Sequence, residues 1–369
     1  MPSNGDWKQP LLALSPSAEA RYNWLDSVNI LLIQLKRIGD MILTTPAVAA
    51  VREAFADARI TLVISYQCSD LAAAIEGVDR VLVMRPGLGA AKTLFEVGRQ
   101  KFNYCVDFTR NDRSALITLV SRAEKRIVSF RVKVRSKLRT RAYNEFVPHR
   151  MRDMHTIDYH LALLAPLGIS NATPAIQLQL PPAAQGNAAL VLKNHNIGDR
   201  FIVFHPGSAR LEKFWAAQYW ADVIDYTANA HPETDLILTG GSGAAEQRHL
   251  EAIKFKVKSP IADLSNKTDL LTLTALLSRA RLLVTVDSAP MHLAAATKTP
   301  QVILFGPTNP FHWRPLQSPA LILQGATPGP VAEFAPKQPR IPMNQISTQA
   351  VISAMETLLS SPAEQPSLS

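Results

Sequence analysis

The chain has 369 residues, 47% hydrophobic and 19% charged, a length that predicts about two domains able to bury cores without disulfides. This composition excludes a disordered chain, a collagen-like chain and a small disulfide-built protein. The formal net charge is +9, from 39 Lys and Arg against 30 Asp and Glu. The two cysteines, Cys68 and Cys105, cannot form a disulfide framework or a four-ligand zinc site by themselves, so we expect them to be small core residues.

The apolar runs are short, and none approaches the roughly 18 to 20 residues needed to span a bilayer. We therefore expect no membrane-spanning segment. Residues 1–27 lack a basic leader, an apolar block and a small-residue cleavage site, so we interpret them as a flexible extension and not a signal peptide. Residues 361–369 are expected to form a polar tail.

In chain order, apolar strand-like runs alternate with segments of helical period. The first half reads VNILLIQL, TTPAVAAVREAF, ITLVIS, SDLAAAI, VDRVLVM, AKTLFEVGRQ and YCVDF. The second half reads FIVFHPG, WAAQYWADVIDYTANA, DLILTG, AAEQRHLEAI, TDLLTLTALLSRA, LLVTVD, PMHLAAATK and QVILFG. This alternation predicts an α/β fold with βαβ units and two parallel sheets.

The two halves are expected to span residues 28–180 and 181–360. Between them, Pro174, Pro181, Pro182 and Gly186 interrupt helical periodicity. A last helical pattern, NQISTQAVISAMETLL, is free to pack back across either domain.

Positive charge is concentrated between Arg122 and Arg141, where nine Lys and Arg accompany one acid, Glu124. From residue 131 to 141 a cation occupies every second position, so in an extended chain six cations would share one face. One interpretation is a solvated strand or loop; the other is a site for an anionic partner. Nucleic acid is the less favoured partner, because no RNP, KH, helix-turn-helix or zinc-finger pattern accompanies the charge.

The first strand leads into KRIGDMILTTPAV. Thr45 followed by Pro46 predicts a helix start with a hydroxyl cap, which leaves Gly39 and Asp40 in the loop after the strand. Open α/β sheets bind ligands at such ends, and a carboxylate there is a candidate general base. The alternative is that Asp40 only caps a helix or pairs with Lys36 or Arg37.

Three strand-to-helix junctions of the second half suit a nucleotide. Gly207 and Ser208 offer amides and a hydroxyl, and Lys213 a cation, for a diphosphate. Asp287 and Ser288 precede the helix start at Pro290, whose free amides favour a phosphate, and His292 is placed to donate to that anion or to a sugar hydroxyl unless it is structural.

The third junction, LTGGSGAAEQ, has glycines that permit close approach to a nucleotide and a glutamate, Glu246, suited to ribose hydroxyls; a tight turn with a surface glutamate is the alternative. GxGxxG is absent after the first strand, which disfavours a dinucleotide oxidoreductase. The sequence also lacks DxD, HExxH, GxSxG and CxxC patterns.

Taken in this order, KRIGDMILTTPAV, HPGSARLEKFW, LTGGSG and VDSAPMHLAAATKTPQVILFGPTNPFHWRP resemble the ADP-heptose:lipopolysaccharide heptosyltransferase family, glycosyltransferase family 9. The resemblance covers roughly residues 28–360, and FHWRP resembles the inner-core type that adds the third, branching heptose. It implies the GT-B architecture, two facing Rossmann-like domains with the nucleotide sugar held mainly by the C-terminal one, and metal-independent transfer that inverts the anomeric centre.

Carried over by residue, the resemblance implies that Asp40 is the catalytic base and that Lys213 offsets charge on the departing ADP. The residues assigned to the donor are Gly39, Ser208, Gly240, Gly241, Glu246, Asp287, Ser288, Ala289 and His292. Those assigned to a phosphorylated acceptor are Lys36, Arg37, Arg110 and Arg113. GGSGAAE departs from the shorter Gly-Pro-x-Glu form of many relatives, and the N-terminal extension and dense basic run are also unusual.

The resulting hypothesis is an enzyme that moves heptose from ADP-heptose to the lipopolysaccharide inner core, needing no cofactor or metal. The basic window would hold it on acceptor phosphates and anionic lipids at the cytoplasmic face of the inner membrane, with no nucleic-acid partner. One alternative is a different sugar or a protein acceptor. Another is a non-catalytic module that binds an anionic surface or nucleic acid.

Overall fold

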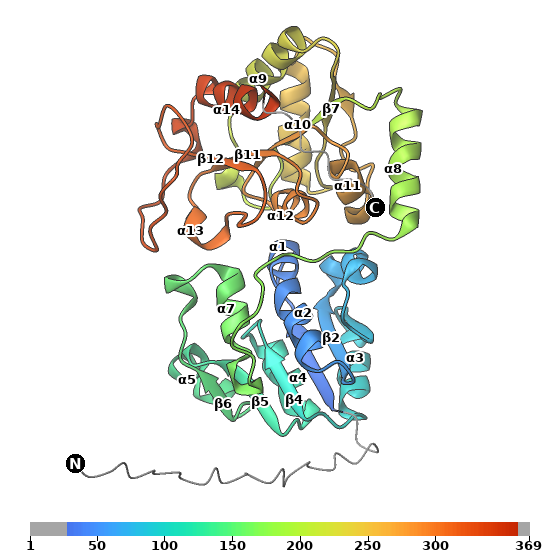
Figure 1. Cartoon of the computed structure of the whole chain (residues 1–369), viewed down its shortest axis with the longest axis vertical. Coiled ribbons are helices and arrows are strands. Elements are labelled where there is room, and N and C mark those ends of the chain that lie inside the picture. Colours follow the sequence, from blue (N-terminus) through green and yellow to red (C-terminus); the bar gives the residue numbers. More distant parts are fainter. Residues whose placement is uncertain (1–27, 361–369) are drawn as a thin grey trace, which may run out of the picture.

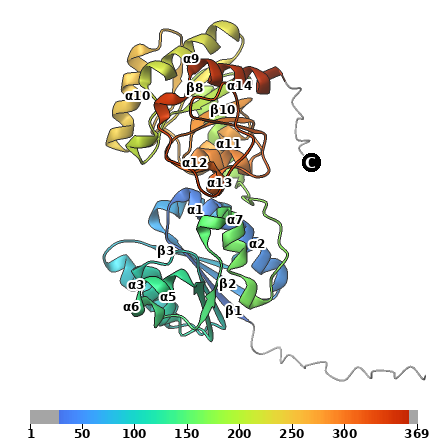
Figure 2. The ribbon, with the colours of Figure 1, turned by 90° about the vertical axis from the view of Figure 1, so that its left-hand side faces the viewer.

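Two parallel six-stranded sheets, each flanked by helices, are stacked along the long axis of the molecule (Figures 1 and 2). The computed structural model describes residues 28–360. The extension predicted for 1–27 and the tail predicted for 361–369 lie outside the described residues. The expected α/β alternation with parallel sheets is confirmed.

The first sheet is built by residues 29–147. Its strands are β1 (Asn29–Gln34), β2 (Arg59–Ser65), β3 (Arg80–Met84), β4 (Tyr104–Asp107), β5 (Lys125–Ser129) and β6 (Glu145–Val147). The α-helices of this half are α1 (Ile38–Ile42), α2 (Thr45–Ala54), α3 (Leu88–Gly98), α4 (Asp112–Ser121), α5 (Arg131–Arg135), α6 (Lys137–Thr140) and α7 (Thr156–Ala162). Short 3₁₀ segments are η1 (Tyr66–Ala74), η2 (Met151–Asp153) and η3 (Ala165–Leu167).

The second sheet is built by residues 201–324. Its strands are β7 (Phe201–His205), β8 (Asp235–Leu238), β9 (Ala262–Asp263), β10 (Leu282–Val286), β11 (Gln301–Phe305) and β12 (Ala320–Gln324). Its α-helices are α8 (Pro182–Asn194), α9 (Ala217–Ala230), α10 (Ala244–Lys256), α11 (Leu270–Leu277), α12 (Ala289–Ala296), α13 (Pro310–Trp313) and α14 (Thr348–Ser360), with 3₁₀ turns η4 (Leu211–Lys213) and η5 (Met343–Gln345).

Both sheets have the same strand order. The first runs β3-β2-β1-β4-β5-β6 and the second β12-β11-β10-β7-β8-β9. Strand order therefore reverses between β1 and β4, which pair in register from Ile30 opposite Tyr104, and between β7 and β10, which pair from Ile202 opposite Leu282. Doubly wound sheets bind ligands at the carboxyl ends of the strands where the order reverses. The predicted site segments follow β1, β4, β7 and β10, with a further one after β8.

The apolar side chains of β1 point alternately to the two faces of the first sheet. Ile30 and Leu32 face the side covered by α2, whereas Leu31 and Ile33 pack against Val97 of α3 and its neighbours. Because both faces are covered by helices, the strand is apolar at every one of these positions. Cys68 and Cys105 are both buried and unpaired, as expected.

Apolar packing continues from the first half into the second. The cluster around α2 extends through Leu71 of η1 to Leu273 and Leu277 of α11, against which α8 also packs. The last helix, α14, packs on the second half only, over α9, β10 and β11. The domain boundary near residue 180 remains a prediction.

Two local predictions are wrong. Gly186 does not interrupt a helix, because it lies inside α8, which begins at Pro182. Thr45 is the first residue of α2 and not its cap, since its hydroxyl donates to the Ile42 carbonyl at 2.8 Å. For the cations from 131 to 141 the sequence left a strand and a loop open, and the structure has the two short helices α5 and α6 there.

A helix that spans a bilayer needs roughly 18 to 20 predominantly apolar residues. Within residues 28–360, no helix has both the length and the apolar composition to cross a membrane.

Candidate active site

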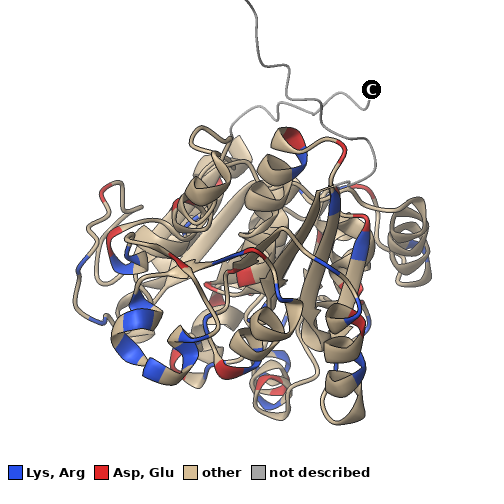
Figure 3. Ribbon diagram, turned by 90° about the horizontal axis from the view of Figure 1, so that it is seen from below, with Lys and Arg blue, Asp and Glu red and all other residues tan. Residues whose placement is uncertain are grey.

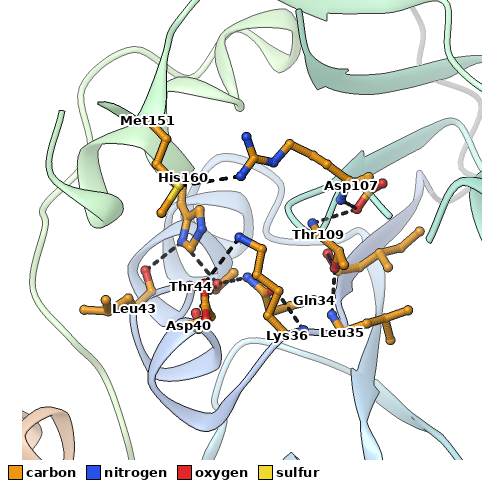
Figure 4. Close-up of polar contacts among 12 residues, drawn as sticks. Gln34, Leu35, Lys36, Asp40, Leu43, Thr44, Asp107, Thr109, Met151 and His160 are labelled. Carbon is orange, nitrogen blue, oxygen red and sulfur yellow. Dashed lines mark hydrogen bonds and ion pairs between the residues drawn. The ribbon is translucent and has the colours of Figure 1, made fainter. Parts of the chain in front are cut away.

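Asp40 lies on the short helix α1 at the carboxyl end of β1, and not in an open loop as predicted. Its carboxylate pairs with Lys36 Nζ at 3.3 Å, one helical turn earlier. The predicted pairing with Lys36 is therefore present, and Asp40 still keeps part of its surface exposed. Figure 4 shows the two side chains together with the network that surrounds α1.

A chain of buried hydrogen bonds fixes the end of α1. Gln34 Nε2 donates to Thr44 Oγ1 at 2.8 Å, and that hydroxyl donates to the Asp40 carbonyl at 2.7 Å. His160 of α7 reaches the same place through Nδ1, which lies 3.1 Å from the Leu43 carbonyl (Figure 4). A carbonyl only accepts, so Nδ1 carries the proton.

His160 was not predicted from the sequence, since no motif marks it. Its ring is fully buried, and burial lowers its pKa to about 3. Its Nε2 has no hydrogen-bond partner among the described residues. The ring therefore stays neutral and ties α7 to the helix that carries Asp40.

Arg110 follows β4 and approaches Lys36. The Asp107 carboxylate accepts from the backbone N–H of Thr109 at 2.7 Å and of Arg110 at 3.1 Å, holding Arg110 at φ 68°. The guanidinium lies over the Tyr159 ring, 5.0 Å from its centre. Burial lowers the pKa of Lys36, Asp40 opposes this, and Arg110 lowers it further. The basic groups of Lys36 and Arg110 therefore lie close together, with Lys36 paired to the Asp40 carboxylate.

Lys213 and Asp287 form a buried ion pair in the second half. Lys213 Nζ donates to Asp287 Oδ2 at 2.6 Å and to the Asp287 carbonyl at 2.9 Å. An ammonium group has three protons, so one remains for a ligand. Helix α12 begins at Ala289, and Ser288 at its N-cap makes no side-chain cap bond to the first-turn amides.

Glu246 lies against the glycines of its own turn and against Gly207, which follows β7. Its carboxylate accepts from the Gly241 N–H at 2.7 Å, and a Cβ on Gly207 would lie 1.7 Å from Glu246 Oε1. At Gly240 a Cβ would meet Leu250 at 2.4 Å. Glycine at these positions therefore leaves room for the side chains of Glu246 and Leu250. Burial raises the pKa of Glu246, whose carboxylate lies 3.8 Å from His205 Nε2.

The two halves meet where Gly39 of α1 faces His292 of α12. A Cβ on Gly39 would lie 2.8 Å from His292 Cδ2. Burial lowers the pKa of His292 to about 4, whereas Asp287 and Asp40 act in the opposite direction, so both carboxylates are close enough to influence this ring. His292 Nδ1 is buried without a hydrogen-bond partner among the described residues.

Two further histidines, also unpredicted, connect the halves. His155 Nε2 donates to the Arg314 carbonyl at 2.9 Å, and His312 Nδ1 donates to the Met154 carbonyl at 2.9 Å. His155 Nδ1 accepts from the Ile157 N–H at 3.2 Å, so the ring is neutral. Burial lowers its pKa to about 4.

The structure thus brings Gly39, Asp40, Lys213 and Asp287 close to His292. Arg37 and Arg113 are exposed, and neither side chain makes an ion pair within residues 28–360. The same residues hold no group of three or more His, Cys, Asp or Glu side chains arranged to bind a metal ion.

Comparison with solved structures defines the class. The glycosyl transferase family 9 structure from Veillonella parvula superimposes with a TM-score of 0.78 at 24% identity, covering 91% of this chain and 98% of that one. The Escherichia coli ADP-heptose lps heptosyltransferase II gives a TM-score of 0.72 at 19% identity, covering 90% and 98%. The fold is that of a GT-B glycosyltransferase.

Sequence comparison then gives the family. The model of glycosyltransferase family 9 (heptosyltransferase) matches residues 91–338, about two thirds of the chain. Lipopolysaccharide heptosyltransferase 3 of Escherichia coli is 25% identical over 286 residues, covering 75% of this chain and 83% of the relative. The chain belongs to glycosyltransferase family 9, as the motifs predicted, and is an enzyme.

Proposed function

We propose that this enzyme transfers heptose from ADP-heptose to a hydroxyl group of the lipopolysaccharide inner core. The relatives named above are heptosyltransferases of lipopolysaccharide, and one is named for ADP-heptose. The observation that carries the mechanism is the approach of Asp40 from one half and of Lys213 and Asp287 from the other to the buried ring of His292.

In this mechanism the Asp40 carboxylate removes the proton of the acceptor hydroxyl. The acceptor oxygen attacks the anomeric carbon from the face opposite the diphosphate, so the anomeric centre is inverted. The bond between that carbon and the diphosphate oxygen breaks, and ADP leaves with the electron pair. General-base assistance of this kind contributes about 10²- to 10⁴-fold to the rate.

Lys213 and the free amides at the start of α12 are placed to stabilise the departing ADP. Charge stabilisation prepared in advance costs no reorganisation when the bond breaks. Ser208 and the unpartnered His292 Nδ1 are further donor contacts in this proposal, as is Glu246 for the ribose once it releases the Gly241 N–H. No metal ion is required, and a chelator is expected to leave the rate unchanged.

The acceptor is proposed to bind through Lys36, Arg37, Arg110 and Arg113. These cations follow β1 and β4 on the side of Asp40, and they suit the phosphates of a lipopolysaccharide core. The enzyme would work as a peripheral protein at the cytoplasmic face of the inner membrane, where cations attract anionic lipid.

The test compares Asp40→Asn with Asp57→Asn, a matched change at an exposed carboxylate of the same half. Release of ADP and mass of the product are measured with ADP-heptose and purified core acceptor. Asp40→Asn is expected to lower kcat by about 10²-fold or more with little change in affinity for ADP-heptose. Near-normal turnover by folded Asp40→Asn, or transfer of another sugar in preference to heptose, would contradict the proposal.

A further inference from the structure

The helices on one side of the first half leave an unusual number of large apolar side chains exposed. The described part of the chain exposes twelve such side chains, and seven of them lie between residues 88 and 138: Leu88, Phe95, Leu116, Leu119, Phe130, Val134 and Leu138. They are carried by α3, α4, the start of α5, and α6. In Figure 2 these helices lie on one face of the first half, and Figure 1 shows that they are spread across that half from α3 at one edge to α5 at the other.

Neighbouring helices of this face share buried clusters. Val97 of α3 and Ile117 of α4 share a buried cluster, and Ala115 of α4 shares another with Val132 of α5. Val132 is the one buried residue of the segment 130–141. The other residues of this segment are exposed or half-buried, and we call residues 130–141 the basic hairpin.

Cations and apolar side chains alternate along the basic hairpin. Val134 is 73% exposed and Leu138 is 74% exposed. Between residues 125 and 144 there are eight Lys and Arg and no Asp or Glu. Only Arg139 of the hairpin is ion-paired within the described residues, to Asp112 at 2.5 Å. Figure 3 shows Lys and Arg crowded on short helices at this side of the molecule.

We propose that the basic hairpin docks the enzyme on an anionic lipid bilayer, with Val134 and Leu138 inserted among the lipids and the cations at the headgroups. This inference rests on the proposed function, because a lipid-anchored acceptor lies in such a bilayer. A charged segment alone would bind headgroups only electrostatically; exposed apolar side chains between the cations add a contribution that salt does not screen. A second copy of this chain is a poor occupant, since two such faces repel each other.

The basic hairpin also contacts a residue of the proposed acceptor site. Arg139 Nη1 donates to the Arg110 carbonyl at 3.2 Å, and its Nε pairs with Asp112 at the start of α4. Arg110 is one of the proposed acceptor contacts beside Lys36. Docking through the hairpin would therefore present the acceptor side of the site to the membrane surface.

The test is vesicle flotation of the full chain with phosphatidylglycerol–phosphatidylethanolamine vesicles and with phosphatidylcholine vesicles, at low and high salt. Wild type is expected to float with the anionic vesicles and to keep part of this binding at high salt. Val134→Ser/Leu138→Ser should weaken binding about tenfold or more and abolish the salt-resistant part. Arg135→Gln/Lys137→Gln should weaken low-salt binding by about fivefold per cation.

Phe255→Ser is the control, because Phe255 is 91% exposed on α10 of the other half. It should bind as wild type does. The docking proposal is wrong if Val134→Ser/Leu138→Ser floats like wild type, if phosphatidylcholine binds equally well, or if sedimentation shows a dimer that this variant dissociates. Heptose transfer to a delipidated acceptor is measured in parallel: its absence from wild type that binds vesicles would contradict the proposed function and not the docking surface.

Discussion

Gly39 and His292 come from opposite halves of the molecule and touch so closely that a single methyl group on Gly39 would lie 2.8 Å from the imidazole. The contact places α1, which carries Asp40, directly on α12, whose N-terminus follows Asp287. A glycine at this position thus decides how near the proposed base comes to the proposed donor site.

Gly39→Ala is expected to lower kcat/KM by up to about a hundredfold, since a displacement of about 1 Å in a reacting pair has effects of this size. Urea unfolding and steady-state kinetics check the two parts of this expectation, because overall stability should change little. Gly186→Ala is the control: it lies within α8 with open space around it, and should add about 0.5–1 kcal/mol of stability without changing the rate.

Lys213→Met should destabilise the protein by about 3–5 kcal/mol, because it leaves the Asp287 carboxylate buried without its partner. Adding Asp287→Asn should restore most of this stability. The double variant should nevertheless remain about 10²- to 10³-fold slower, since the cation facing the leaving group is missing. Recovery of the rate together with stability would show that the pair is only structural.

The exposed ion pair of Arg279 and Asp199, at 3.0 Å, provides the comparison. Arg279→Met should cost no more than about 1 kcal/mol. Calorimetry of ADP binding distinguishes the two ion pairs further. Lys213→Met should weaken ADP binding, whereas Arg279→Met should leave it unchanged.

Replacement of His160 should affect turnover more than substrate binding. His160→Leu removes the donor to the Leu43 carbonyl and loosens the end of α1, so kcat should fall about tenfold while KM for ADP-heptose changes little. His160→Asn keeps a donor at this position and should recover most of the activity. Equal losses in both variants would argue that the ring fills space and does not position Asp40.

Acid should destabilise the protein between about pH 6.5 and pH 4. Burial lowers the pKa of His155, His205 and His292 to about 4 each, so the unfolded chain binds more protons than the folded chain in this interval. Their contribution to stability is complete above pH 6.5 and is lost as the pH falls toward 4. Each histidine should contribute a slope of about 1.4 kcal/mol per pH unit.

Urea unfolding at a series of pH values measures this slope. His205→Asn keeps a polar group near Thr239 Oγ1. This variant should reduce the slope by the contribution of one histidine, about 1.4 kcal/mol per pH unit. His149→Asn, at an exposed position, should leave it unchanged. A slope that does not respond to His205→Asn would show that this ring titrates normally.

Much of this protein follows from local sequence. The apolar runs of β1, β4, β7 and β10 predict buried parallel strands, and polar or glycine residues after them predict ligand-binding junctions, because the period of the side chains and the chemistry of helix starts are local properties. Asp40, Lys213 and Asp287 stand at such junctions, so the sequence by itself marks them as candidate site residues.

Other features required the tertiary structure. Several contacts join residues more than a hundred positions apart, so no local pattern contains them. They are the contact of Gly39 with His292, the hydrogen bond of His160 to the Leu43 carbonyl, and the hydrogen bonds of His155 and His312 between the two halves. The alternating cations after residue 130 show that a regular local pattern need not determine the backbone conformation. Their spacing would put six cations on one face of an extended chain, but left a strand and a loop open as alternatives. They form α5 and α6, because Val132 packs into a buried cluster and packing, not charge spacing, selects the backbone conformation there.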